Sequence, residues 1–401
     1  MPADVTLISP FPPVVSGGPL TSGVASYTQR LSGALSRAGL RVSVVADQVG
    51  GEPVTTEVGG VTVHRHYRRG LRALPAAVSV ARQQGAPVVH LQHEMFLYGG
   101  PSSVAGLAPS LAHLRRSRNG PVVTMHQVVD PESVDARFVD LHRVRVPERV
   151  ARVAIRGVQG AVDKWAGMTV VHGSAFQRVI PAARVVHHGV EPAVALSRSA
   201  SRRRLGLAQS EFVVLCFGFV APYKGLEAAL EAGAMAGPRV RIVIAGGVHP
   251  RLAGRDHYGS DLRRRFGSMA HFTGYVPDEE VAPLFSAADL VLLPYPRAFS
   301  SSGALTTALS YGNALLCSES VARCNELPNE TITGVEPHQL AQRLLGLASD
   351  PRLLEQLRRS VDDTARSRSW DDVARRHVEL YEEVIGADGA LSGGLRPGES
   401  R

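Results

Sequence analysis

Short apolar runs alternate with amphipathic segments along most of the chain. Residues 4–9, DVTLIS, predict a strand, and residues 24–39 place apolar side chains at the spacing of one helix face. Gly39 suits the end of that helix, and residues 41–46 predict the next strand. Later strands are predicted at 87–92, 121–126, 168–172 and 184–188, with helices near 73–84, 103–117, 147–166 and 174–180. This alternation favours a doubly wound sheet of parallel strands.

A polar stretch rich in Ser and Arg at 191–210 interrupts the pattern and is interpreted as a linker. The alternation then restarts, with strands predicted at 212–220, 239–247, 271–273, 288–295 and 313–318 and helices at 224–236, 259–268 and 278–287. Three closing helices are predicted at 336–349, 351–366 and 370–386. We therefore expect an α/β protein of two Rossmann-like domains, residues 1–190 and 211–369, followed by the last helix and a disordered tail at 387–401.

Length and composition agree with two globular domains. The chain has 401 residues, and one core rarely grows beyond about 250 to 300. It contains no apolar run near the roughly 18 residues that a membrane-spanning helix needs. The first residues, MPADVTLISPFPP, lack the basic and apolar regions of a signal peptide, and only three cysteines occur. We expect a cytoplasmic protein.

The net charge of +8 is compatible with an anionic partner or with solvated basic surface. No aromatic and basic motif of a nucleic-acid module is present, so nucleic acid is not expected as a partner. Arginine clusters in the first half, such as the one between 143 and 156, leave peripheral contact with an anionic membrane as an open alternative. Of the 44 basic residues only Lys164 and Lys224 are lysines. A lysine in a distinctive loop is therefore interpreted as a position that needs a compact ammonium group rather than a guanidinium.

Candidate chemistry lies in the loops after the strands, where helix N-termini present unpaired N–H groups to ligands. The loop after the first strand carries glycines, among them Gly23, but it fits neither G-x-G-x-x-G nor a P-loop. His90 and His93 have HxxH spacing without a third ligand nearby, so no metal site is expected. His126 ends a predicted strand. A structural role and a functional role are equally open for this histidine.

Two loops of the second half suit an anion. Lys224 stands at the start of a predicted helix, where a cation opposes the helix dipole unless an anion lies between them. Ser300, Ser301, Ser302 and Gly303 precede another helix, although simple capping needs only one hydroxyl. With His126 in the other half, these loops predict a diphosphate-linked ligand bridging a cleft.

The order of motifs along residues 4–386 resembles the GT-B glycosyltransferases, specifically the large retaining family 4. The resemblance is carried by SPFPPVVSGG with SGVASYT, VVHLQHE, VVTMHQ, VVHHGVE, CFGFVAPYKGLEAALEA, HFTGYVPDEEVAPLFSAADLVLLPY, SSSGALTTALSYGNALL and SWDDVARRHVELYEEV. It implies two Rossmann-like domains facing a cleft, with a nucleotide-diphosphate-sugar donor bound mainly by the second. It also implies that helix 370–386 crosses back to the first domain and that no cofactor or metal is needed. The absence of a DxD sequence agrees with the last point.

The resemblance also assigns residue roles. Lys224 pairs with the donor diphosphate and His126 stands beside the transferred sugar. Further donor contacts are implied for Gly23, Tyr275, Val276, Ser301, Ser302 and Gly303, and acceptor contacts for His93 and Glu94. Tyr275 and Val276 match the segment that holds the base through main chain.

The sequence departs from the family pattern at two places. The usual Glu-x7-Glu pair falls at Phe299 and Thr307, as in SSG-type variants that lack it, and the usual phosphate arginine falls at Phe219. Glu326 is a substitute candidate for a sugar contact. These losses put the donor-sugar contacts in doubt more than the activity.

The implied activity is retaining, metal-independent hexosyl transfer from a nucleotide-sugar to an acceptor hydroxyl. No motif identifies the acceptor, which is a sugar, a natural-product scaffold or a lipid-linked glycan. Two alternatives stay open: a sugar phosphorylase or epimerase on the same fold, and an inactive paralogue that binds a nucleotide-sugar without turnover.

Overall fold

The structure is a computed structural model that describes residues 2–15, 22–116, 119–248, 257–386 and 391. The chain forms two compact units. The first consists of Met1–Val134, Glu148–Gly189 and Ser369–Arg401, and the second of Asp135–Pro147 and Val190–Arg368. We predicted a first domain over 1–190, but residues 135–147 belong to the second unit.

The first unit contains an eight-stranded sheet in the order β3-β4-β2-β1-β5-β6-β7-β8. Its strands are β1 (Val5–Ile8), β2 (Val42–Asp47), β3 (Thr55–Val58), β4 (Val61–Tyr67), β5 (Val88–His93), β6 (Val122–Met125), β7 (Met168–Val171) and β8 (Arg184–Val185). All pairings are parallel except that of β3 with β4. This edge hairpin turns at Gly59 and Gly60, with φ of +56° and +81°, and was not predicted from the sequence.

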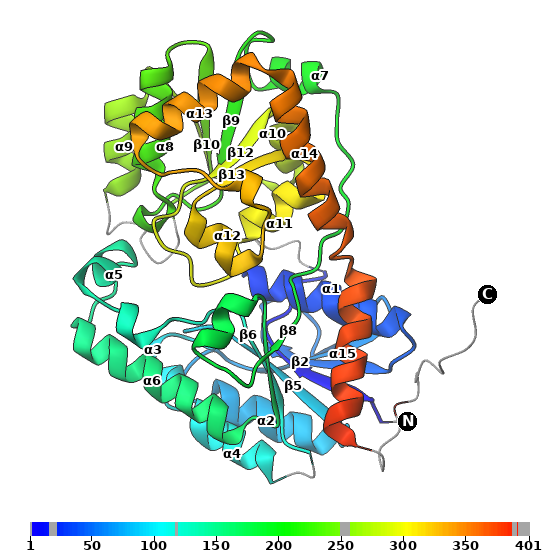
Figure 1. Ribbon diagram of the computed structural model, residues 1–401. Coiled ribbons are helices and arrows are strands. Elements are labelled where there is room, and N and C mark those ends of the chain that lie inside the picture. Colours follow the sequence, from blue (N-terminus) through cyan, green and yellow to red (C-terminus); the bar gives the residue numbers. More distant parts are fainter. Residues whose placement is uncertain (1, 16–21, 117–118, 249–256, 387–390, 392–401) are drawn as a thin grey trace. The chain divides into compact units, whose positions relative to one another are not determined.

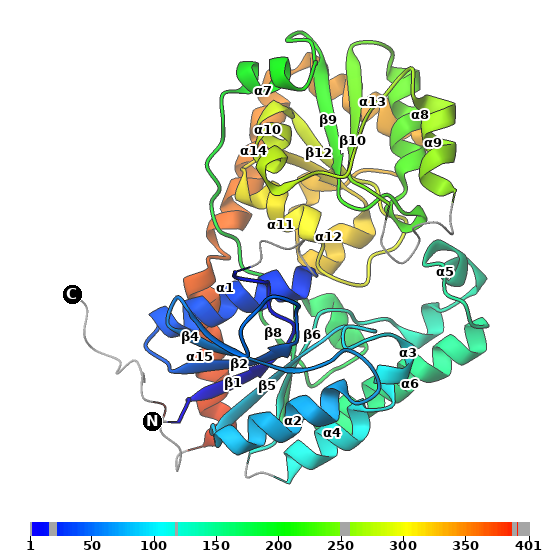
Figure 2. The same cartoon turned by 180° about the vertical axis from the view of Figure 1, so that it is seen from behind.

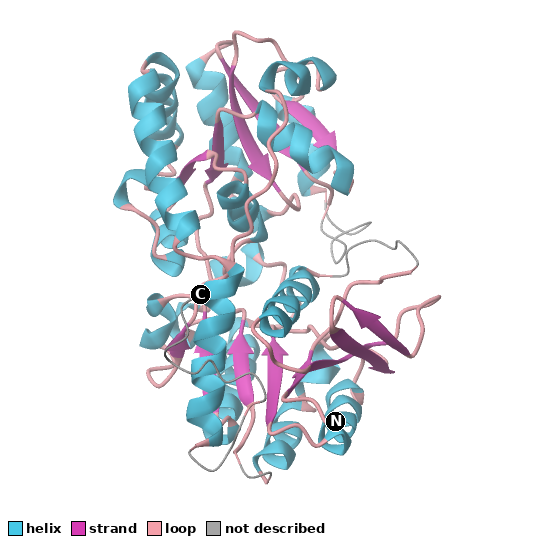
Figure 3. Cartoon of the chain, turned by 90° about the vertical axis from the view of Figure 1, so that its right-hand side faces the viewer, coloured by secondary structure: helices cyan, strands magenta, loops and turns pink. Residues whose placement is uncertain are grey.

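Helices cover both faces of this sheet (Figure 3). They are α1 (Gly23–Arg37), α2 (Ala73–Gln84), α3 (Pro101–Val104), α4 (Leu107–Arg115), α6 (Glu148–Trp165) and α15 (Trp370–Ile385), with the 3-10 turns η1 (Pro131–Ser133) and η2 (Ser174–Arg178). Figure 1 shows α15 alongside α1, and Trp370 and Tyr381 of α15 are buried in the core that α1 and the sheet form. The segment predicted as a helix at 174–180 is a 3-10 turn. The predicted disordered tail lies outside the described residues, apart from Leu391, which is buried in the same core.

The second unit contains a parallel five-stranded sheet in the order β11-β10-β9-β12-β13 (Figure 2). Its strands are β9 (Phe212–Phe217), β10 (Val240–Ala245), β11 (His271–Gly274), β12 (Leu290–Leu293) and β13 (Ala314–Cys317). Alternate residues of each central strand enter different cores: Val213 and Leu215 face one, and Phe212, Val214 and Cys216 the other. Burial on both faces explains why these strands are almost wholly apolar.

The helices of the second unit begin with two that were not predicted from the sequence, α5 (Ala136–Leu141) and α7 (Arg198–Arg204). The others are α8 (Leu226–Ala236), α9 (Tyr258–Phe266), α10 (Asp278–Ala287), α11 (Gly303–Ser310), α12 (Glu319–Asn325), α13 (Pro337–Ser349) and α14 (Pro351–Arg366), with the 3-10 turns η3 (Pro222–Lys224) and η4 (Asn329–Thr331). The stretch 191–210, interpreted as a linker, therefore contains a helix. Arg202 of α7 is fully buried and pairs with Asp289 at 2.5 Å, which anchors that helix.

Candidate donor-binding site

A buried ammonium group lies after β9 in the second unit. Lys224 is 8% exposed, and its Nζ donates a hydrogen bond to the Tyr295 hydroxyl at 2.5 Å. The ammonium also lies 4.1 Å from the centre of the Tyr295 ring and 5.3 Å from that of Tyr223. Burial lowers the pKa of Lys224, and no carboxylate contributes to its environment in the described part of the chain. A charge held this way favours an anion supplied by a ligand.

The position of Lys224 differs from the prediction in one respect. It closes the 3-10 turn η3, and α8 begins only at Leu226. Gly225 between them has φ of +64°, and a Cβ there would stand 2.2 Å from the Pro294 carbonyl oxygen. The turn can therefore approach the end of β12 only because residue 225 is glycine.

Tyr295 joins Lys224 to the N-terminus of α11. Its hydroxyl lies 3.1 Å from Ser302 Oγ. Ser302 is the N-cap residue of α11, but its side chain makes no capping hydrogen bond. The phenol oxygen thus accepts a hydrogen bond from Lys224, and a second hydrogen bond joins the hydroxyls of Tyr295 and Ser302. We call Lys224, Tyr295 and Ser302 the ammonium cluster.

The other residues predicted around this helix stand beside the cluster. Ser301 is half-buried, and Gly303 is exposed, with no atom within 4 Å of the place that a Cβ would take. Thr307 donates its hydroxyl to the Gly303 carbonyl at 2.9 Å. Glu326 ends α12 in the left-handed conformation, with φ of +49°, and its carbonyl accepts from Arg368 at 3.2 Å. Its exposed side chain stays an unassigned candidate.

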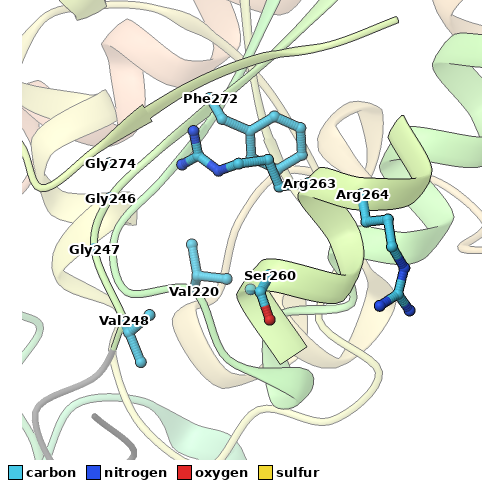
Figure 4. A pocket seen from close by; sticks show the side chains of 10 residues that line it. Val220, Gly246, Gly247, Val248, Ser260, Arg263, Arg264, Phe272 and Gly274 are labelled. Carbon is cyan, nitrogen blue, oxygen red and sulfur yellow. The ribbon is translucent and has the colours of Figure 1, made fainter. Parts of the chain in front are cut away.

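A cavity of about 490 Å³ opens near the ends of β10 and β11 (Figure 4). Arg263 extends from α9 over the ring of Phe272, with 5.2 Å between its guanidinium carbon and the ring centre, whereas Arg264 points away. Gly246, Gly247 and Gly274 contribute main chain to the wall; the other lining residues are Val220, Val248, Gly259 and Ser260. The walls are thus mostly apolar, with a cation at one edge.

The residues predicted to hold a base adjoin this cavity. A Cβ at Gly247 would be 3.4 Å from the Cα of Tyr275, so the main chain of Tyr275 passes close to a glycine that lines the cavity. The Tyr275 side chain is 68% exposed, while Val276 packs against the core. Phe219, which stands where the family has an arginine, is 44% exposed after β9.

His126 follows β6 in the first unit, and protein groups bond to both of its ring nitrogens. His172 donates its Nδ1 proton to the Val186 carbonyl at 2.9 Å, so the Nε2 of a neutral His172 ring accepts. His126 Nδ1 lies 3.1 Å from that atom, and His126 Nε2 lies 2.8 Å from the side-chain amide of Gln92. The tautomer of His126 and the orientation of that amide are set together by these contacts.

The environment of His126 keeps its ring neutral. Burial lowers its pKa well below the ordinary value, and the neighbouring His172, His188, His90 and His93 lower it further. Tyr27 of α1 packs edge-on against the ring at 4.7 Å. No role was predicted for Tyr27 or Gln92, although both stand in segments that carry the resemblance, SGVASYT and VVHLQHE. A neutral, doubly hydrogen-bonded ring suits contact with a ligand better than proton abstraction.

The remaining candidates of the first unit also follow its strands. His93 ends β5 and is buried, which lowers its pKa to about 4. Glu94 follows it and is half-buried. Gly23 begins α1, whose N-cap Ser22 accepts from the Ala25 amide at 3.1 Å. Most of the preceding glycine-rich loop lies outside the described residues.

The described residues contain neither a metal cluster nor a membrane-spanning helix. No group of three or more His, Cys, Asp or Glu side chains there is placed to hold a metal ion. In the same part of the chain, no helix combines the length and the apolar character that crossing a membrane requires.

Comparisons with known proteins find relatives in sequence and in fold. Residues 211–350 match the family described as glycosyl transferases group 1. D-inositol 3-phosphate glycosyltransferase of Thermobispora bispora is 27% identical over 271 residues, which are 61% of this chain and 59% of that relative. This chain thus spans about three fifths of the length of that curated relative.

Solved structures share the fold over almost the whole chain. Sucrose-phosphate synthase from Thermosynechococcus elongatus matches with a TM-score of 0.72 at 18% identity, over 95% of this chain and 98% of its own. Anabaena HepE in complex with UDP-glucose matches with a TM-score of 0.69 at 16% identity, over 94% of this chain and 99% of its own. The predicted fold class is confirmed. Together, the match of residues 211–350, the curated relative and the shared fold support the predicted resemblance to the GT-B glycosyltransferases of family 4.

Proposed function

We propose that this protein transfers a sugar from a nucleotide-diphosphate donor to an acceptor hydroxyl. The observation that carries the proposal is the buried Lys224 ammonium, which only neutral groups surround in the described residues. A diphosphate would supply the missing negative charge. Ser301, Ser302 and Gly303 at the N-terminus of α11 offer hydroxyl and N–H groups to the same anion.

The chemistry follows from where charge develops. When the bond between the sugar C1 and the diphosphate oxygen breaks, negative charge grows on the diphosphate, and Lys224 and the α11 N-terminus stabilise it. The acceptor oxygen forms its bond to C1 on the same face, and its proton passes to a phosphate oxygen. Retention of configuration and independence from metals belong to this proposal, and the neutral His126 ring contacts the sugar without acting as a base.

The donor is proposed to be a nucleotide-sugar with its base at the cavity beside Tyr275 and Val276. The apolar walls and the Arg263 guanidinium over Phe272 suit a planar polar ring. A solved neighbour holds UDP-glucose, so uridine donors are the first to test. The acceptor, on the side of His93 and Glu94, remains a sugar, a natural-product scaffold or a lipid-linked glycan, and a cytoplasmic site near an anionic membrane remains a prediction.

Donor binding can be tested with the two lysines of the chain. The thermal stability of the wild type, Lys224→Ala and Lys164→Ala is measured with UDP, GDP, ADP and dTDP and their sugar forms. A ligand at 100 times its Kd should add about 2.7 kcal/mol of stability to the wild type. Lys164 lies on α6 over the Trp165 ring, so its variant should respond like the wild type. Equal shifts in all three proteins would remove Lys224 from the site.

An inactive binding paralogue is the second candidate, because Phe299 and Thr307 stand where the family carries two carboxylates. It predicts a nucleotide-dependent shift without release of nucleotide from any donor and acceptor pair. A phosphorylase would instead need inorganic phosphate for turnover. Transfer that continues in EDTA would support the metal-independent mechanism.

A further inference from the structure

A segment of chain between two elements of the first unit belongs to the second. The chain leaves the first unit after Val134 and returns to it at Glu148, and Asp135–Pro147 packs within the second unit. This segment contains the short helix α5, whose N-cap Asp135 accepts a hydrogen bond from the Phe138 amide at 2.7 Å. Its contacts fall on the two loops that carry the ammonium cluster.

The first contact is a two-pronged ion pair. Arg297 donates to both carboxylate oxygens of Asp135, at 3.0 and 2.8 Å. The Arg297 hydrogen bonds lower the pKa of Asp135 to about 2, so the carboxylate is charged at neutral pH. Arg297 stands between Tyr295 and Ser302. The pair therefore fixes the loop that links two members of the ammonium cluster, in a geometry that only the flat guanidinium fork provides.

The second contact is aromatic. Phe138 packs edge-on against Phe299 at 5.3 Å, and His142 lies 5.6 Å from the same ring. His142 also stacks on Tyr223, with ring centres 5.4 Å apart and planes 10° from parallel. Tyr223 in turn lies beside Lys224, whose ammonium is 5.3 Å from the centre of the Tyr223 ring. The stacked rings therefore adjoin the ammonium cluster. One short segment thus touches the Lys224 turn and the loop before α11.

We propose that Asp135, Phe138 and His142 form a clamp that positions the donor site. It holds the turn of Lys224 and the loop before Ser302 at the spacing that a diphosphate requires. This inference rests on the proposed function. If release of the clamp leaves only a fraction of molecules with both loops in place, the apparent Kd for the diphosphate rises by the inverse of that fraction.

The test uses the full chain and calorimetric titration with UDP, GDP, ADP and dTDP. Asp135→Asn should weaken binding of the nucleotide that the wild type prefers by about threefold to tenfold, and the pair Phe138→Ala with His142→Ala by a similar factor. Asp140→Asn is the matched control, because Asp140 pairs with Arg143 inside the segment, at 2.6 Å. The exchange of Asp135→Arg with Arg297→Asp should recover part of the loss.

Tryptic cleavage after Arg145 gives an independent measure, since that exposed residue lies in the segment. The nucleotide should slow this cleavage in the wild type and in Asp140→Asn, but not in Asp135→Asn. A clamp with a merely structural role would change thermal stability and leave both the Kd and this protection unaltered, which would overturn the proposal.

The outcomes also separate the two proposals. If Lys224→Ala loses nucleotide binding while the clamp variants bind like the wild type, the clamp is wrong and the proposed function stands. If none of the four nucleotides binds the wild type, the proposed function fails and the clamp fails with it. Circular dichroism at the titration temperature confirms that each variant is folded.

Discussion

Lowering the pH from about 7.5 to about 5.5 should destabilise the first unit by several kcal/mol. Burial holds the pKa of His93 and of His377 at about 4 and that of His172 at about 3, and it lowers the pKa of His90 and His126 well below the ordinary value. In the unfolded chain these side chains titrate near the usual value of about 6.5. The unfolded state therefore binds protons first, and stability falls as the pH drops below about 6.5.

The size of the effect follows from proton linkage. At pH 5.5 a histidine that is neutral when folded and has an unfolded pKa of about 6.5 costs about 1.4 kcal/mol. His93, His172 and His377 together therefore cost about 4 kcal/mol, and His90 and His126 add to the loss in the same direction. Because whole domains are stable by only about 5 to 15 kcal/mol, this is a large share.

The assay is urea unfolding followed by tryptophan fluorescence. Both tryptophans, Trp165 on α6 and Trp370 on α15, belong to the first unit, so the signal reports that unit alone. His377→Leu should reduce the loss between the two pH values by about 1.4 kcal/mol. His338→Gln is the control, since His338 is exposed on α13 of the second unit.

Two results would refute the reasoning. A free energy of unfolding that changes by less than about 0.5 kcal/mol between the two pH values would mean that the histidines are charged in the folded state or accessible to water. An equal loss of stability between the two pH values in His377→Leu and in the wild type would mean that His377 does not contribute to the pH dependence. Carboxylates contribute little to the measured difference, because their usual pKa values of about 4 lie below the pH range of the experiment.

Three further predictions concern the second unit. Lys224→Met should raise the free energy of unfolding of the ligand-free protein by about 1 kcal/mol while abolishing nucleotide binding, since it removes a buried charge that lacks an ion-pair partner in the described residues; equal stability would argue against that burial. Arg202→Met should cost about 1.5 to 3 kcal/mol in urea unfolding because it leaves the buried Asp289 carboxylate with Arg198 as its ion-pair partner, and adding Asp289→Asn should recover part of the loss. Gly225→Ala should lower the melting temperature and weaken nucleotide binding together, because its Cβ would stand 2.2 Å from the Pro294 carbonyl; unchanged binding would show that the turn tolerates a shift.

The sequence predicted the fold where burial imposes a period. The strands of the second unit were found because alternate residues enter two cores and leave continuous apolar runs. The edge strand β3 and its neighbour β4 were missed. Thr55–Val58 is exposed or half-exposed and mostly polar, whereas Val61–Tyr67 does alternate, and the Gly59–Gly60 pair between them signals a turn. The helices α5, α7 and α12 were missed because six or seven residues are too few to show a helical period.

The sequence singled out residues of the ammonium cluster but not the contacts between them. Lys224 and Ser302 were singled out from their loops, and the structure brings them together. Tyr295, which joins them, was visible only as a tyrosine between two prolines after a strand. No pattern in the sequence reports which way its side chain points. Likewise, nothing local indicated that Asp135 would pair with Arg297, because that contact depends on how a distant segment folds.

The choice of a tyrosine beside Lys224 has a physical consequence. A carboxylate in that place would neutralise the ammonium without a ligand, and a diphosphate would have to displace or repel it. Unit charges about 4 Å apart attract by about 4 kcal/mol near a protein surface, so such a pair would remove much of the driving force for binding. The Tyr295 hydroxyl instead orients the ammonium by one hydrogen bond and leaves its charge uncompensated. The clamp residues follow the same logic, because Asp135 is committed to Arg297 and the side chains nearest Lys224 on that side are aromatic. The ligand is thus left as the source of negative charge at this site.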